Sequence, residues 1–154
     1  MRVFIENEAG SVTKNLYDQR TLAHLGSTRV SLPYPYPYGF VVGTSSGDGD
    51  AVDCFVLTNG ALPAGKTIAC DPVGLLEQVE DGEIDHKVLV VPSGDRLLLD
   101  ESIVTDLRSF ISGVFAHVPG KRIEIGLVRS RDEAEAYVAA CGEECAATGD
   151  EVSS

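Results

Sequence analysis

The chain has 154 residues, 44% of them hydrophobic and 23% charged, which is the composition of a folded protein with one domain. Its 24 acidic and 12 basic residues give a formal net charge of −12, which argues against nucleic acid or an anionic membrane as a partner, because no basic surface neutralises their phosphates. No run approaches the roughly 20 apolar residues of a membrane-spanning helix, and cysteines inside apolar runs are typical of a reducing compartment, so we expect a cytoplasmic protein.

Strand patterns dominate the first two thirds of the sequence. Short alternating or apolar runs of strand type cover residues 2–6, 39–44, 53–58 and 87–92, with turn-forming clusters of Pro, Gly, Asn and Asp between them. A helix is predicted over residues 104–118, a strand over 121–128 and a second helix from residue 130. This order predicts an α+β, β-rich fold with two helices in the C-terminal half, not alternating βαβ units. We expect one domain over residues 1–146 and a flexible tail over 147–154.

Residues 60–67, GALPAGKT, fit the nucleotide-binding pattern G-x-x-x-x-G-K-[ST] at every position. Such a loop binds phosphate because its backbone N–H groups stand at the start of a helix. The following sequence carries Pro72 and Gly74 where the interior of that helix would lie, and both residues break helices. The motif therefore suggests a nucleotide site, but its context argues against one.

A second candidate site is the acidic loop DGDAVD, residues 48–53, which precedes an apolar strand. Asp48, Asp50 and Asp53 stand at positions i, i+2 and i+5, so a turn of the chain brings their carboxylates together. Three clustered carboxylates repel one another unless a hard cation lies among them. The loop is therefore either a cation site or an acidic surface turn.

Other residues favour the cation site. A rigid, tyrosine-rich segment over residues 34–40 leads towards the acidic loop, and a second acidic loop ends with Asp85 and Lys87. Glu6 and Lys14 lie near the N-terminus. Tyrosine hydroxyls and lysine ammoniums around a cation that carboxylates hold are the groups that phosphoryl chemistry needs.

Taken in order, these motifs resemble those of the soluble (family I) inorganic pyrophosphatases. The matching segments are FIE at 4–6, Lys14, YPYPYGF at 34–40, DGDAVD at 48–53, PAGKTIACDPVGLL at 63–76 and DHKVLVVP at 85–92. The likeness covers residues 2–140. It implies a small five-stranded barrel of the OB type and homo-oligomers, often hexamers in bacteria. It also implies that GALPAGKT is a connection and the start of a strand, with no nucleotide role.

The resemblance implies a role for each motif residue. It assigns Mg²⁺, with Mn²⁺ as a substitute, to the carboxylates of Asp48, Asp53, Asp85 and Glu80. It assigns catalysis to Asp50, as the base that activates a water, together with Tyr38 and Lys87. It assigns pyrophosphate binding to Lys14, Arg29, Tyr38 and Lys87, with Glu6 and Tyr34 in support.

The sequence departs from the family pattern on the phosphate-binding side. Leu16 replaces the acid of the family's K-x-E motif, and Ala51 replaces the proline of D-G-D-P-x-D. Arg29 matches the family arginine only if the loop before the tyrosine motif has lost residues. His117 and Val118 stand where a Tyr-Lys pair follows the first helix. The expected metal ligands are therefore all present, whereas some of the expected phosphate-binding residues are missing.

The resemblance implies metal-dependent hydrolysis of inorganic pyrophosphate to two phosphates, by attack of a water that the metal ions activate. Two alternatives follow from the departures. The first is a degenerate, non-catalytic member that binds Mg²⁺ or phosphate compounds. The second is a hydrolase of another phosphoanhydride, admitted by the loss of residues that contact the substrate.

Overall fold

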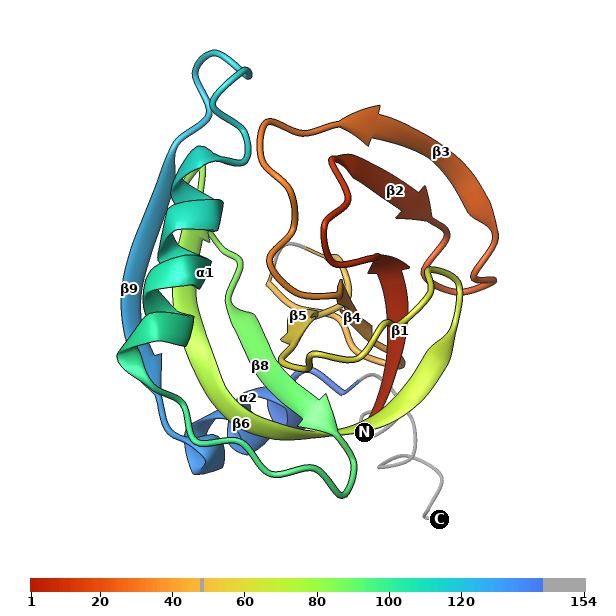
Figure 1. Cartoon of the computed structure of the whole chain (residues 1–154), viewed down its shortest axis with the longest axis vertical. Helices are drawn as coiled ribbons and strands as arrows, with labels where there is room; N and C mark the ends of the chain where they lie inside the picture. The colour runs from red at the N-terminus through yellow and green to blue at the C-terminus, as the bar shows by residue number, and fades with distance from the viewer. Residues whose placement is uncertain (48, 143–154) are drawn as a thin grey trace.

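The structure, a computed structural model, describes residues 1–47 and 49–142 (Figure 1). The elements within these residues are β1 (Arg2–Asn7), β2 (Thr13–Tyr17), β3 (His24–Arg29), β4 (Tyr38–Val41), β5 (Asp53–Val56), β6 (Thr67–Glu80), β7 (Glu83–Ile84), β8 (Lys87–Pro92), α1 (Glu101–Gly113), β9 (Ile123–Arg129) and α2 (Arg131–Ala140). None of the helices in the described part of the chain is long and apolar enough to cross a membrane. All of the predicted tail, residues 147–154, lies outside the described residues, as do residues 143–146.

Five strands form a ring of pairings. β1 pairs with β4, β4 with β5, β8 with β6 and β6 with β1, all antiparallel, while β5 and β8 are parallel. The circuit returns to its first strand, which is the arrangement expected of an OB-like barrel. Figure 1 shows how β6 makes this possible, because it curves along the base of the molecule from β1 on one side to β9 on the other.

The strong curvature of β6 comes from the residues that suggested a break in the sequence. Its pairing with β8 shifts register between Pro72 and Gly74, and its pairing with β9 shifts between Leu76 and Gln78. Such bulges bend and twist a strand without ending it. The sequence therefore indicated correctly that this segment is not a helix, but it did not predict a single strand of 14 residues.

Both predicted helices are present, but the first is displaced at both ends, since it covers Glu101–Gly113 where residues 104–118 were predicted. The first begins at Glu101, three residues before the predicted start, because the side chain of Asp100 accepts a hydrogen bond from the N–H of Ile103 and caps it. The second is capped by Ser130, whose side chain accepts from the N–H of Glu133 at 3.2 Å, as its sequence predicts.

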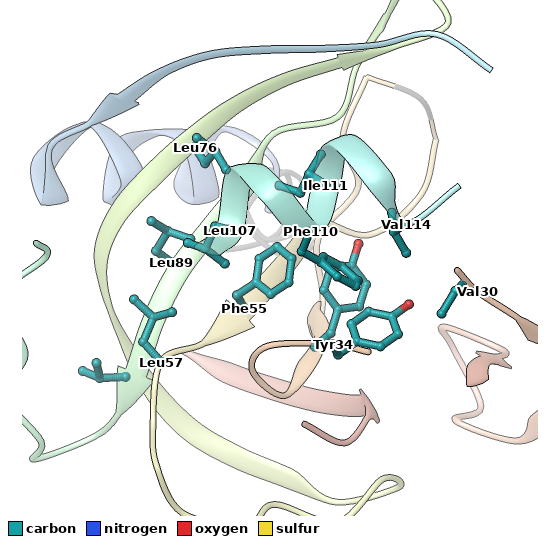
Figure 2. Close-up of a cluster of buried hydrophobic side chains, with 12 residues drawn as sticks. Val30, Tyr34, Phe55, Leu57, Leu76, Leu89, Leu107, Phe110, Ile111 and Val114 are labelled. Carbon is teal, nitrogen blue, oxygen red and sulfur yellow. The ribbon is translucent and has the colours of Figure 1, made fainter. Parts of the chain in front are cut away.

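The strand pleat divides the core into two apolar clusters. Phe55 of β5 and Leu89 of β8 point to the side that α1 covers, where they pack with Phe110 (Figure 2). Their neighbours Cys54 and Val88 point the other way, into a cluster that α2 covers. The α1 side is also the side on which the tyrosine-rich segment lies, so this cluster supports the candidate site directly.

The antiparallel pairing of β1 with β4 requires glycine at position 39. Gly39 lies opposite Ile5, and a Cβ atom there would overlap the carbonyl oxygen of Phe4. We therefore expect Gly39→Ala to lower the free energy of unfolding by about 3 kcal/mol or more, since a backbone atom cannot move aside as a side chain can. Denaturant titration followed by circular dichroism measures this.

Gly26→Ala is the matched control. Gly26 also lies in a strand, but no atom stands within 4 Å of the position that a Cβ atom would take there. Its substitution changes the free energy of unfolding little. Equal stabilities of the two variants would contradict the close approach of β1 and β4.

Candidate functional site

A cavity of about 600 Å³ opens where the β2–β3 hairpin, β6, the start of β8 and α1 meet. Nine of the residues predicted from the sequence line it: Glu6, Lys14, Tyr34, Tyr38, Asp50, Asp53, Glu80, Asp85 and Lys87. They come from widely separated segments, and the fold brings them to one place. Arg29 is not among the described lining residues, and Asp48 lies outside the described residues.

The parallel pairing of β5 with β8 sets the centre of the cavity. Both strands begin at its edge, and their register places Asp53 opposite Lys87. Asp85 lies two residues before Lys87, in the turn that enters β8, and Tyr38 begins β4 beside β5. Charged side chains therefore gather at strand starts, while the residues that follow in each strand are buried and apolar.

Lys87 joins these strand ends through its ammonium group. The side chain is buried, and Nζ donates hydrogen bonds to Oδ2 of Asp53 at 2.8 Å, Oδ2 of Asp85 at 3.0 Å and Oη of Tyr38 at 3.0 Å. Burial of a single charge is unfavourable, but here two carboxylates compensate it. The ammonium and the two carboxylates thus form one interacting unit.

The pKa values in this unit follow from burial and from the shared charge. Burial alone would lower the pKa of Lys87, but the carboxylates of Asp53 and Asp85 raise it above its usual range. Burial, with the nearby charge of Asp53, raises the pKa of Asp85 to about 7, although Lys87 opposes the shift. Burial also raises the pKa of the Tyr38 hydroxyl, so that it stays protonated.

The donor chemistry of the cavity suits a hard divalent cation. Carboxylates of Asp50, Asp53 and Asp85 line it, and oxygen ligands are those that Mg²⁺ prefers. Within residues 1–47 and 49–142 no three His, Cys, Asp or Glu side chains already stand in the geometry of a metal site. Gln78 adds a further oxygen, because its buried Oε1 has no hydrogen-bond partner in the described part of the chain. The residues fit a cation, but Lys87 holds two of the carboxylates.

Glu6 is a second carboxylate of the cavity whose pKa is strongly raised. Burial, and then the charge of Asp53, raise its pKa to about 8, although Lys14 and Lys87 oppose the shift. The carboxyl group of Glu6 is therefore neutral in the folded protein over much of the range in which an exposed glutamate is ionised.

Glu80 is paired with a lysine that the sequence did not suggest. Nζ of Lys121 lies 3.0 Å from Oε2 of Glu80 and 4.5 Å from the ring centroid of Phe115. Lys14 lies 5.2 Å from the centroid of the same ring. The sequence shows no cation after the first helix where the family has one, and Lys121 brings a cation to that region from farther along the chain.

Polar residues of the turn between β2 and β3 also line the cavity and were missed. They are Asp18, Gln19 and Arg20. The β2–β3 hairpin was not predicted, because its strands are half exposed and carry no apolar alternation. A signal was present, since Asp18 accepts hydrogen bonds from the N–H groups of Arg20 and Thr21, the type of turn that aspartate favours.

The nucleotide hypothesis for residues 60–67 is wrong. The segment is followed by a strand, β6, where a phosphate-binding loop requires a helix. Its backbone extends the pairing with β1, since the N–H of Gly65 donates to the carbonyl of Ile5 and the N–H of Ile5 donates to that of Lys66. The side chain of Lys66 is exposed, away from the lining of the cavity.

Comparison with known proteins gives a consistent match. The sequence model of the family described as inorganic pyrophosphatase matches residues 3–145. An inorganic pyrophosphatase of Halalkalibacterium halodurans is 29% identical over 150 residues, which are 92% of each chain. That of Mycoplasma pneumoniae is 36% identical over 108 residues, or 68% of this chain and 58% of the relative's length.

Solved structures give the same result. A structure from Anaplasma phagocytophilum, described as an inorganic phosphatase, superposes with a TM-score of 0.85 at 27% identity and covers 92% of this chain and 90% of that one. An inorganic pyrophosphatase from Thermus thermophilus has a TM-score of 0.83 at 28% identity, with 92% and 88% coverage.

The raised pKa of Glu6 has a consequence for stability. The unfolded chain releases this proton near pH 4.5, whereas the folded protein keeps it up to about pH 8. The folded state therefore binds more protons in this window, and the free energy of unfolding falls as the pH rises through it. We expect Glu6→Gln to flatten that fall when stability is measured by denaturant titration in a chelator between about pH 5 and pH 8.

Glu124→Gln, an exposed change on β9, is the control and keeps the wild-type dependence. Asp85 contributes in the same direction, so the slope of the Glu6 variant decreases without vanishing. Parallel curves for wild type and Glu6→Gln would show that Glu6 does not titrate as described.

Proposed function

The chain belongs to the inorganic pyrophosphatase family, and we propose that it hydrolyses inorganic pyrophosphate to two phosphates with the help of a divalent cation, Mg²⁺ or in its place Mn²⁺. The observation that carries the proposal is the convergence of nine motif residues on one cavity. These residues were matched by their order in the sequence alone, so their meeting in one cavity supports the match independently.

The balance of charge in the cavity supports a metal cofactor. Six carboxylates and three cationic side chains are among its described lining residues. Pyrophosphate is itself strongly anionic, so this cavity would repel it without added positive charge. A bound cation supplies that charge and also lowers the pKa of a water molecule, so that a hydroxide forms near neutral pH.

The carboxylates divide into two roles in this proposal. The cations are held by Asp53 and Asp85, together with Asp48, which belongs to the same acidic loop as Asp53. Asp50 is exposed in the cavity and acts as the general base that accepts a proton from the attacking water. Glu80 joins the metal ligands, since Lys121 contacts its Oε2 and a carboxylate has a second oxygen with which to bind a cation.

The cationic and hydroxyl groups bind the substrate. Tyr38 accepts a hydrogen bond from Lys87, which leaves its own hydroxyl hydrogen to donate to a phosphate oxygen. Lys87 would stabilise negative charge on the leaving phosphate. Lys14 lies at the cavity mouth beside Phe115, and Tyr34 packs against Tyr38 with a centroid separation of 5.4 Å.

The non-catalytic alternative is not favoured, because the described carboxylates that the reaction needs still line the cavity. Hydrolysis of another phosphoanhydride also has no observation of its own in support. Homo-oligomeric assembly, hexamers included, and a cytoplasmic location stay predictions from the resemblance and the composition.

A comparison of two variants tests the proposal. Asp50→Asn keeps the shape of an exposed side chain but removes the base, so we expect phosphate release from pyrophosphate to fall about 10²- to 10⁴-fold. Lys66→Ala changes an exposed residue outside the lining of the cavity and should alter activity less than about threefold. Both are measured with Mg²⁺ in one phosphate-release assay.

The wild-type protein in a chelator is the second control, and it should release no phosphate. An active Asp50→Asn beside an inactive Lys66→Ala would contradict the assignment of the site. Release of phosphate from nucleotides in preference to pyrophosphate would instead favour the hydrolase of another phosphoanhydride.

A further inference from the structure

We propose that Arg20, in the turn between β2 and β3, is a substrate-binding residue whose guanidinium contacts a phosphate group of pyrophosphate, and that Gln19 positions it. The inference rests on the proposed function, since it assigns a further contact in the same cavity. It replaces the assignment of Arg29, and it concerns a residue outside the family motifs matched above.

The first argument is the state of the cations in the cavity. Its described lining residues include three cations, Lys14, Arg20 and Lys87. Lys87 is already bound to two carboxylates and is buried. Within the residues that the structure describes, no ion pair involves Lys14 or Arg20. These two side chains are therefore the ones available to an incoming anion.

The strand register excludes Arg29 from the same role. Lys14 and Leu16 of β2 both line the cavity, so alternate residues of this strand face it up to the bulge between Leu16 and Tyr17, where Tyr17 also joins the lining. Arg29 lies directly opposite Thr13 in the hairpin, and cross-strand partners share a face. Arg29 therefore points to the side away from Lys14, in agreement with its absence from the described lining.

The turn that carries Arg20 is held by its own hydrogen bonds. Oδ1 of Asp18 accepts from the N–H groups of Arg20 at 2.9 Å and Thr21 at 2.8 Å. The N–H of Leu22, which has a positive φ of 64°, donates to the carbonyl of Asp18 at 2.7 Å. Leucine rarely adopts this conformation, so the backbone is strained at Leu22, and the hydrogen bonds keep the turn tight in spite of that strain. The backbone of Arg20 is thereby fixed.

A second contact fixes the turn to the acidic loop. Oε1 of Gln19 accepts a hydrogen bond from the N–H of Ala51 at 2.9 Å, across 32 positions of sequence. The family pattern has proline at this position, and proline has no N–H to donate. Ala51 therefore permits a contact that the usual residue forbids, and that contact ties the turn that carries Arg20 to the loop that carries Asp50, both of which line the cavity.

The chemistry of the side chain suits the role. A guanidinium group offers planar, paired N–H donors that match two oxygens of one phosphate. Arg20 is exposed at the cavity, and no ion pair within the described part of the chain holds its guanidinium. Two departures from the family pattern, the alanine at 51 and the absent arginine, then have one structural explanation.

Arg20→Gln tests the contact directly. Hydrogen bonds to charged groups contribute enough for about a ten- to hundredfold change in binding, so we expect KM for pyrophosphate with Mg²⁺ to rise about that much, with a smaller change in kcat. Arg20→Lys restores part of the loss. Arg96→Gln removes the same charge from an exposed loop residue outside the cavity lining and leaves KM unchanged. Arg29→Gln also leaves KM near the wild-type value.

A double variant tests the positioning by Gln19. Gln19→Ala should raise KM less than Arg20→Gln does, without changing the pH profile of kcat, because it frees the turn and removes no charge. If Gln19 acts through Arg20, the variant with both changes is no worse than Arg20→Gln alone. Losses that add would show that Gln19 acts separately, and they would overturn the positioning role.

Binding without turnover separates this inference from the proposed function. Imidodiphosphate, a pyrophosphate analogue with a nitrogen bridge, is titrated calorimetrically with Mg²⁺ into each intact protein. If the wild type releases no phosphate from pyrophosphate, the proposed function fails, yet weaker imidodiphosphate binding by Arg20→Gln still supports the contact. Equal binding by wild type and Arg20→Gln, a loss confined to Arg29→Gln, or no binding by the wild type would each overturn it.

Discussion

The buried ammonium of Lys87 is the contact on which the arrangement of the cavity depends. It binds Asp53 from β5, Asp85 from the turn before β8 and Tyr38 from β4, so that three parts of the fold meet at one nitrogen atom. Removal of one partner from a buried ion pair typically destabilises a protein by about 3–5 kcal/mol, because the remaining charge is left uncompensated. The same carboxylates are the proposed metal ligands. The ammonium therefore holds in place the groups that a cation needs.

The predictable parts of the fold are those with local signals. Strands β1, β5 and β8 follow from short apolar runs, and the start of α2 follows from its capping residues. β6 was not predicted as one strand, because Pro72 and Gly74 are breakers in a sequence but form a bulge when β8 pairs beside them. The β2–β3 hairpin was missed for a different reason: its strands bury little apolar surface, so no periodic pattern marks them.

The residues of the candidate site also divide into those that local sequence signals predicted and those that such signals missed. The motifs with fixed spacing, such as the acidic loop and the pair Asp85 and Lys87, led to residues that line the cavity. Arg29 was assigned to phosphate binding from its spacing, but the register of the hairpin places it on the face away from Lys14, and spacing alone does not give that register. Lys121 was not predicted because its link to the site is an ion pair with Glu80, which lies far from it in sequence, together with a contact with the ring of Phe115.

The parallel pairing of β5 with β8 has a consequence for the order of folding. Every other pairing in the five-stranded ring is antiparallel. Asp53 and Lys87 meet only after the chain between them, which includes β6, has folded back so that β8 lies beside β5. Contacts that require such long-range closure form late, since the entropy of the loop is lost before the contact is gained. A chain in which β8 has not yet paired with β5 thus leaves Asp53 without its ammonium partner and the cavity incomplete. The proposed activity then reports that this pairing has formed.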